Sequence, residues 1–153
     1  IFTDCIAMGG NLLLDIGPRE DGTIDERQTA LLNGLGKFVK RNAEAIYGTE
    51  AGLPPEHFAG ASTLSKDKKT LYLFVAGVPS GGVCIKGLCS DIKSVTCLHN
   101  GKALRWDRYG GAPWFDIPGL TWIFLTAEDC CSDMTVVKIE LDDAVRLYRP
   151  DGK

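Results

Sequence analysis

The stretch Gly9-Gly10-Asn11-Leu12-Leu13-Leu14-Asp15-Ile16-Gly17-Pro18 decides the fold class of the N-terminal part of the chain. A turn of small residues leads into a short apolar segment, Leu12 to Ile16, which ends at Gly-Pro and is followed by the turn signal Asp21-Gly22. This order predicts a buried strand followed by a helix, which is one β/α unit of a parallel sheet. Because a single β/α unit cannot close a sheet, we expect the chain to begin inside a domain and the chemistry to lie outside these residues.

Two helices are expected on either side of this strand. Residues 1–8 carry apolar side chains at helical spacing and should end at Gly9-Gly10. A longer helix should run from about Asp25 to Ala45, with a capping box at Thr23-x-x-Glu26 or Asp25-x-x-Gln28 and a C-terminal stop at Gly48. Its apolar stripe consists of Leu31, Leu32, Leu35, Phe38, Val39, Asn42 and Ile46.

Beyond the Gly- and Pro-rich connector Gly52-Leu53-Pro54-Pro55 the apolar period changes from helical to alternating, so we divide the chain into residues 1–50 and 51–153. Recurring turn signals separate short candidate strands. These are Thr70–Ala76, Val83–Ile85, Ile92–Leu98, Ala103–Arg105, Trp114–Ile117, Leu120–Leu125, Thr135–Leu141 and Ala144–Tyr148. About eight short strands in this length predict an antiparallel β-sandwich, and the fold class is α/β plus all-β.

Composition excludes several classes of partner. The 153 residues carry a net charge of −3 with scattered Lys and Arg, which argues against nucleic acid. No stretch of about 18 apolar residues is present, so we expect no membrane span. The six cysteines are irregularly spaced, and the Cys84-x₄-Cys89 and Cys130-Cys131 pairs fit a zinc site poorly. Buried free thiols are the favoured interpretation, with disulfides and a metal site as alternatives; no cofactor is implied.

The first block, continued by Glu20-Asp21-Gly22-Thr23-Ile24 and then by Asn42-Ala43-Glu44-Ala45-Ile46-Tyr47-Gly48-Thr49, resembles α-L-fucosidases of glycoside hydrolase family 29. The first block is similar to the last strand of that family's (β/α)₈ barrel and the loop after it, and the second to the end of the final barrel helix. Thr70-Leu71-Tyr72-Leu73 and the strand 135–141 are similar to first and last strands of its C-terminal sandwich. Two positions depart from the family pattern, which more often has Asn at Asp15 and Gly at Ala43.

The resemblance implies the C-terminal portion of a retaining exo-glycosidase that releases terminal α-L-fucose from fucosylated glycans. Such an enzyme uses two carboxyl groups roughly 5–5.5 Å apart, one as nucleophile and one as acid/base. In the family both lie upstream of the matching region, so we assign no catalytic residue in this chain and expect it to be inactive alone. The rest of the barrel is the implied partner, and an extracytoplasmic location follows from the family's usual setting.

Asp15 is the one candidate for substrate binding, because barrel active sites lie at the C-terminal ends of the strands. The favoured interpretation, however, is that it only caps or braces the following loop. The neighbouring carboxylates Glu20 and Asp21 precede a helix, where acidic side chains are normally solvated and favour the helix dipole. We therefore do not assign them acid/base roles.

The sandwich concentrates aromatic side chains that could stack on sugars or fill the core, namely Trp106, Tyr109, Trp114, Phe115 and Trp122. The core, or a seal against a neighbouring domain, is the favoured interpretation. His57 and His99 are expected at the surface or in capping roles, and Arg105-Trp106-Asp107-Arg108 at a solvated edge. The alternative functions are a carbohydrate-binding module and a purely structural brace.

Overall fold

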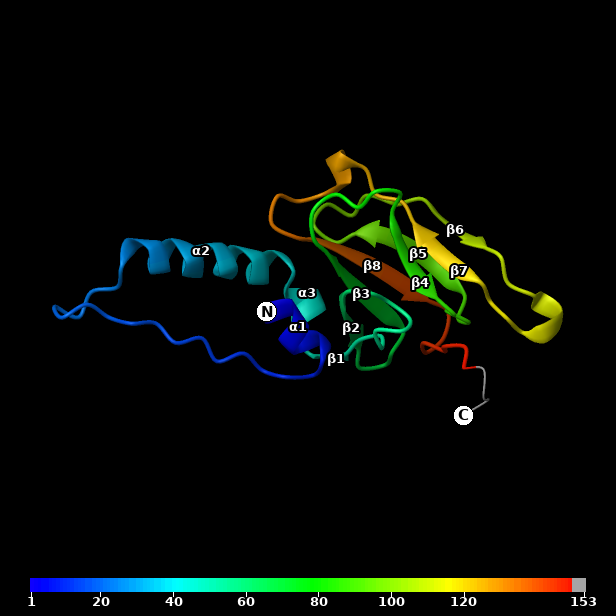
Figure 1. Cartoon of the computed structure of the whole chain (residues 1–153), viewed down its shortest axis with the longest axis horizontal. Helices are drawn as coiled ribbons and strands as arrows, with labels where there is room; N and C mark the ends of the chain where they lie inside the picture. The colour runs from blue at the N-terminus through cyan, green and yellow to red at the C-terminus, as the bar shows by residue number, and fades with distance from the viewer. Residues whose placement is uncertain (150–153) are drawn as a thin grey trace.

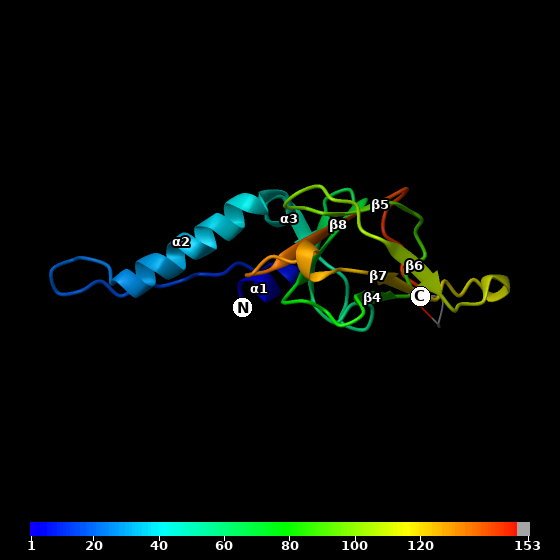
Figure 2. The same cartoon turned by 90° about the horizontal axis from the view of Figure 1, so that it is seen from above.

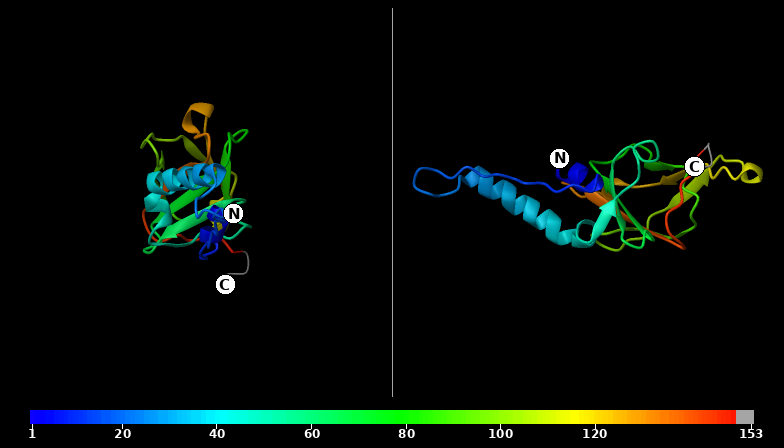
Figure 3. Two further views of the ribbon diagram at one scale, coloured as in Figure 1. Left: turned by 90° about the vertical axis from the view of Figure 1, so that its left-hand side faces the viewer. Right: turned by 90° about the horizontal axis from the view of Figure 1, so that it is seen from below.

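The computed structural model describes residues 1–149 as an antiparallel β-sandwich with an arm that projects from one end (Figure 1). The arm contains the segment after α1 (Phe2–Ala7) and the helix α2 (Glu26–Arg41), and it is followed by the short helix α3 (Ala43–Ile46). Views from above (Figure 2) and from below (Figure 3, right) show the arm extending well beyond the sheets. The molecule is therefore elongated, with most of its core in the sandwich.

Two sheets form the sandwich. The first has the strand order β1-β2-β3-β8-β5, and the second has the order β4-β7-β6. Every pairing between these strands is antiparallel. The strands are β1 (Thr49–Ala51), β2 (Ala61–Ser65), β3 (Thr70–Val75), β4 (Val83–Lys86), β5 (Ile92–Cys97), β6 (Trp106–Tyr109), β7 (Leu120–Ile123) and β8 (Thr135–Leu141).

The central strand β3 is apolar on both faces because both faces are covered. Side chains on successive residues of a strand point to opposite faces. Leu71 and Leu73 face the second sheet and contribute to the main core, where they lie with Ile85, Ile123 and Ile139. Tyr72 and Phe74 face the other way and pack with Phe38, Ala45 and Val136 in a second core under the helices. The run Thr70-Leu71-Tyr72-Leu73-Phe74-Val75 thus belongs to a three-layer arrangement of helices, sheet and sheet.

Several expected strands are confirmed, and β8 has the predicted bounds. Three strands of the described residues were missed: β1 and β2, which are short and rich in small or polar residues, and β6, which lies in the expected solvated edge. Trp114–Ile117 is not a strand, since Pro113–Phe115 forms the 3₁₀ helix η1 at the tip of the β6–β7 hairpin. Ala103–Arg105 and Ala144–Tyr148 contribute only the isolated bridges at Ala103 and Leu147.

The expected buried strand Leu12 to Ile16 is extended but is not part of a sheet in the described residues. Leu13 is 87 % exposed, and Leu14 and Ile16 are also exposed. A strand needs a hydrogen-bonded neighbour, and no strand among residues 1–149 pairs with this segment. Residues 1–149 contain no closed barrel, and the barrel unit of the expected fold class is not shown by them. Their two antiparallel sheets are consistent with the expected sandwich.

The chain division at residue 50 falls inside β1. Thr49 and Glu50 pair with Ser65 and Leu64 of β2, and Ala51 continues the same ladder. β1 therefore joins the region before the connector to the first sheet of the sandwich.

Candidate functional site

The segment that carries Asp15 links α1 to α2. Gly9 ends α1 with a φ of 74°, which glycine adopts without strain, and the chain then runs extended through Asp15. The only ladder contact in the following loop is the antiparallel bridge between Pro18 and Ile24. Asp15 is exposed and has no hydrogen-bond or ion-pair partner among residues 1–149. Its carboxylate is free to face a neighbour, and no contact in the described structure defines its role.

In the loop between residues 19 and 25, the acidic side chain of Asp21 is hydrogen-bonded within the loop itself. The Asp21 carboxylate accepts hydrogen bonds from the Thr23 backbone N–H and hydroxyl, at 2.9 and 2.7 Å. These hydrogen bonds lower the pKa of Asp21 below its usual value, so it is ionised at neutral pH. Glu20 beside it is exposed. The geometry is that of a local turn, as expected for solvated carboxylates that precede a helix.

Asp25 is the N-cap of α2 and ties the loop to the helix. Its side chain accepts from the Arg27 backbone N–H at 2.8 Å and from the Arg19 guanidinium at 2.7 Å. The ion pair with Arg19 is the main reason why the pKa of Asp25 is lowered. The reciprocal half of the expected capping box is not formed, since the buried Gln28 side-chain oxygen has no partner in the described residues. The loop and the helix start thus form one ordered unit.

The C-terminal end of α2 is fixed to the outer face of the first sheet. Phe38 lies between Phe2 of α1 and Phe74 of β3, with both ring centroids 6.5 Å away. Asn42 is buried and donates from its side-chain amide to the Phe38 carbonyl at 3.0 Å. Leu31, in the first half of the helix, is 66 % exposed. Only part of the expected apolar stripe is therefore covered by the residues described.

Helix α3 is held to the sheet by polar contacts. The Glu44 carboxylate accepts from the Tyr72 hydroxyl and the Lys138 ammonium, each at 2.8 Å. The ion pair lowers the pKa of Glu44 and raises that of Lys138, while burial and Glu44 together raise the pKa of Tyr72. Thr63 of β2 donates its hydroxyl proton to the Ala45 carbonyl at 2.7 Å. The segment Asn42-Ala43-Glu44-Ala45-Ile46 is thus the joint between arm and sandwich.

Comparison with known proteins identifies this arrangement. Residues 1–44, the arm and the start of the joint, match the family model described as alpha-L-fucosidase. The chain is homologous to the C-terminal part of family 29 α-L-fucosidases. An alpha-L-fucosidase of Branchiostoma floridae is 29 % identical over 115 residues, which cover 73 % of this chain and 26 % of that protein. The human plasma alpha-L-fucosidase is 30 % identical over 111 residues, covering 69 % of this chain and 24 % of that protein.

Solved structures give the same result for the fold. The alpha-L-fucosidase from Vibrio sp. strain EJY3 superposes with a TM-score of 0.78 at 24 % identity, over 96 % of this chain and 26 % of that chain. The fucosidase-related chain therefore spans about a quarter of the length of these relatives. The similarity includes both the arm and the sandwich.

The aromatic side chains in the sandwich of this chain do not form one platform for stacking on sugars. Trp106 packs against the main core and Trp122 is half-buried. Trp114 and Phe115, which lie in η1, are 78 % and 72 % exposed, so they do not fill the core. Trp122 and the half-exposed Tyr109 line a small surface hollow with Ser80 and Phe124.

The two histidines lie in different environments, and neither has a catalytic neighbour. His57 is buried, so of the two expected roles, surface or capping, the surface position is wrong. Its Nδ1 lies 2.8 Å from the Lys86 carbonyl oxygen. It docks the connector onto β4, which sequence periodicity could not show because the contact spans 29 residues. His99 is half-buried in a turn, and its Nδ1 has no partner in the described residues.

All six cysteines of this chain are free, but only Cys97 is fully buried. Burial raises the pKa of the Cys97 thiol to about 11. The other five are half-buried, so the expectation of buried thiols is correct for one side chain and partly correct for the others. Across residues 1–149 no group of three or more His, Cys, Asp or Glu side chains could hold a metal ion. The same residues contain no helix with the length and apolar character needed to cross a bilayer.

Proposed function

We propose that this chain is the C-terminal portion of an α-L-fucosidase, a retaining exo-glycosidase that hydrolyses terminal α-L-fucose from glycans. In this proposal the arm supplies the last strand and helix of a catalytic (β/α)₈ barrel, and residues 51–153 form the accessory sandwich. The observation that carries it is the match of residues 1–44 to the fucosidase family model. The named relatives extend that similarity into the sandwich.

Exposed apolar side chains on the arm support the barrel assignment. Five apolar side chains of the arm are at least 40 % exposed, namely Leu13, Leu14, Ile16, Ile24 and Leu31. Large exposed apolar groups on one element usually mark a surface that another element covers. Neighbouring barrel strands and helices would bury them and would supply hydrogen-bond partners to the extended segment around residues 12–16. Asp15 would then lie near the C-terminal end of a barrel strand, where barrel active sites are built.

The catalytic carboxylates are proposed to lie on a part of the polypeptide that these 153 residues do not contain. The acidic side chains on the arm support this, since Asp21 and Asp25 are engaged in local turn and capping contacts. The two carboxyl groups of a retaining glycosidase must flank one sugar at roughly 5–5.5 Å from each other. We accordingly expect the 153-residue chain alone to be inactive.

The test uses an aryl α-L-fucoside with two proteins, the 153-residue chain and a longer polypeptide that joins it to an upstream barrel. The longer polypeptide should release the aryl group and give α-L-fucose as the first product by NMR, the outcome of retention. The chain alone should release none. Turnover by the chain alone would overturn the placement of the carboxylates, and an inactive longer polypeptide that is folded by circular dichroism would overturn the fucosidase assignment.

Asp15 is proposed to contact the substrate and is tested in the active polypeptide. Replacement Asp15→Asn restores the residue more common in the family, and Asp15→Ala removes the polar group. We expect Asp15→Ala to raise KM by about tenfold, the effect of losing one charge-assisted hydrogen bond, and Asp15→Asn to raise it less. Asp21→Asn is the matched control, because its carboxylate is already used by Thr23. Equal KM values for Asp15→Ala and the control would assign Asp15 to loop bracing.

The alternative is a carbohydrate-binding or purely structural module. The exposed Trp114 and Phe115 favour it, because aromatic faces stack on sugars. Glycan-array binding by the whole chain that Trp114→Ala abolishes would support the binding module. We further propose an extracytoplasmic location, which the name of the plasma relative supports and which fractionation of the source cells would test.

A further inference from the structure

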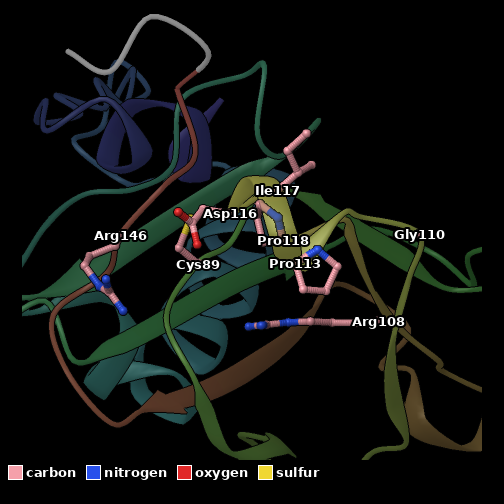
Figure 4. A pocket seen from close by; sticks show the side chains of 8 residues that line it. All are labelled: Cys89, Arg108, Gly110, Pro113, Asp116, Ile117, Pro118 and Arg146. Atoms are coloured by element: carbon pink, nitrogen blue, oxygen red, sulfur yellow. The ribbon is translucent and has the colours of Figure 1, made fainter.

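A hollow of about 820 Å³ lies on the sandwich, at the end opposite the arm (Figures 1 and 4). It is bounded by the β6–β7 hairpin, the residues that follow β4 and the segment after β8. Four of its lining side chains are charged or nucleophilic, namely Cys89, Arg108, Asp116 and Arg146. None of these belongs to the proposed barrel.

Arg108 enters the hollow from β6 and is only partly satisfied by the protein. One terminal nitrogen of its guanidinium donates to the Ser90 carbonyl, which fixes the direction of the side chain. Its Nε is buried and has no acceptor among the described residues. A guanidinium carries several N–H donors, so donors of the terminal nitrogens beyond the one used by Ser90 are left for a ligand in the hollow.

Arg146 approaches from the opposite side, and its backbone is firmly held. Its N–H donates to the Ser90 hydroxyl and its carbonyl accepts from the Cys89 N–H, both at 2.8 Å. In residues 1–149 neither Arg146 nor Arg108 forms an ion pair within 4 Å. The side chain of Arg108, from β6, and that of Arg146, from the segment after β8, both line the hollow (Figure 4). Two guanidinium groups that line one hollow can together donate to the oxygens of one oxyanion.

Asp116 adds a negatively charged hydrogen-bond acceptor to the lining of the hollow. It follows η1 in a left-handed conformation with a φ of 56° and is exposed. Like Arg108, it belongs to the β6–β7 hairpin, and its side chain is among those that line the hollow (Figure 4). A carboxylate here accepts hydrogen bonds from hydroxyl groups and repels a bare polyanion. The complementary ligand therefore has one oxyanion and hydroxyl groups next to it.

We propose that this hollow binds an acidic sugar, one that carries a single uronate carboxylate or sulfate ester. The terminal nitrogens of Arg108 and Arg146 donate to the oxyanion, and Asp116 accepts from a sugar hydroxyl. The site recognises charge and hydroxyl groups together, and its occupancy does not depend on fucoside turnover.

The Cys89 thiol in the wall of the hollow provides the readout. Its rate of alkylation by iodoacetamide is followed by mass spectrometry, with Cys84 outside the hollow as internal control; trypsin cleavage after Lys86 separates the two. Glucuronate should slow alkylation of Cys89 at least threefold at saturation, inorganic sulfate should slow it at higher concentration only, and glucose should have no effect. Sodium chloride is added to keep the ionic strength equal in every arm.

Three variants assign the effect to the proposed contacts. Arg146→Gln should weaken the apparent affinity for glucuronate about tenfold, the value of one charge-assisted contact. Asp116→Asn, which the left-handed conformation tolerates, should weaken glucuronate and strengthen sulfate. Arg105→Gln is the matched control, because Arg105 is exposed and stacks 3.9 Å above the Phe124 ring instead of lining the hollow.

Several results would overturn the proposal. These are protection by sodium chloride equal to that by glucuronate, protection of Cys84 equal to that of Cys89, or equal effects of Arg105→Gln and Arg146→Gln. Equal affinity for sulfate and glucuronate in the parent protein would remove the role of Asp116 and overturn the assignment to a sugar. Absence of any protection at 50 mM, roughly the weakest affinity of interest for one sugar site, would also overturn it.

Discussion

The Glu44 carboxylate and the Lys138 ammonium face each other across the joint, with Oε1 and Nζ 2.8 Å apart. Glu44 lies on α3 and Lys138 on β8, so one ion pair connects the arm to the middle of the first sheet. Lys138 also lies 3.3 Å from Glu140, and Glu44 accepts from Tyr72. The contact is therefore a small network whose members can be separated by mutation.

A double-mutant cycle should measure this ion pair. Glu44→Gln and Lys138→Met are each expected to destabilise the chain, with a coupling energy of about 0.5–1 kcal/mol, because Glu44 is half-exposed and solvent weakens the pair. The measurement is urea unfolding at pH 7. Glu44 has a lowered pKa, so the coupling should be present above its usual value of 4.5 and lost as the pH falls below it. A coupling that stays constant down to pH 2.5 would show that charge is not its origin.

Phe38 should be the main apolar anchor of the arm. Phe38→Ala removes a buried ring from between Phe2 and Phe74 and should cost about 3–4 kcal/mol in urea unfolding. It should also increase cleavage of the arm by a protease. Leu31→Ala on the same helix is the control and should change stability by less than about 0.5 kcal/mol, because Leu31 is exposed in this chain. Similar losses for both variants would contradict the location of the second core.

Asp129 should make stability depend on acid pH. This buried carboxylate closes a capping box with Thr126 and pairs with Lys102, and these contacts, Lys102 first, lower its pKa to about 2. Its contribution is present above the usual pKa of 3.8 and is lost as the pH falls through 2. We expect Asp129→Asn to cost about 1–2 kcal/mol at pH 7.

The control for Asp129 is Glu128→Gln, an exposed neighbour in the same 3₁₀ helix. The stability difference between the parent chain and Asp129→Asn should become smaller from pH 4 down to pH 2, whereas the control should follow the parent at each pH. A difference that grows on acidification has the wrong sign and would rule out this assignment of the carboxylate. Thermal unfolding followed by circular dichroism is sufficient.

Two glycines should respond in opposite directions to alanine. A Cβ on Gly52 would overlap the backbone of Ser62 in the neighbouring strand, so Gly52→Ala should destabilise the chain by about 2–3 kcal/mol. A Cβ on Gly34 meets nothing within 4 Å in the middle of α2, so Gly34→Ala should stabilise it by about 0.5–1 kcal/mol. Unfolding midpoints of the two variants in urea provide the check. A neutral Gly52→Ala would mean that β1 and β2 can separate at little cost.

The elements predicted well from sequence are those whose pattern reflects contacts within the described residues. β8 alternates strictly and has the bounds that the alternation indicates, and β3 is continuous and apolar because it is covered on both faces. Leu12 to Ile16 has an equally apolar pattern, but these residues provide no neighbour for it. Pattern alone describes what a segment can pair with and not whether the partner is present.

The hollow at Arg108 and Arg146 could not be predicted in the same way. Its residues are spread from Cys89 to Arg146 and come together only through the β6–β7 hairpin and the segment after β8. Trp106-Asp107-Arg108-Tyr109 forms β6, whose side chains alternate between half-buried and exposed positions, but the sequence itself does not alternate between apolar and polar residues. Asp15, in contrast, was singled out through the resemblance, and its role stays a prediction.

β1 has a consequence for how this region can be inherited. β1 is the edge strand of the first sheet and pairs with β2. The outer face of β3 is covered by Phe38 and Ala45 from the preceding helices. If a gene rearrangement moved only the residues after the connector into another protein, the transferred sheet would have an open edge and an uncovered aromatic surface. Both features promote aggregation. Transfer to another protein should therefore succeed only when the helices travel with the strands, which ties the evolutionary history of the sandwich to that of its neighbour.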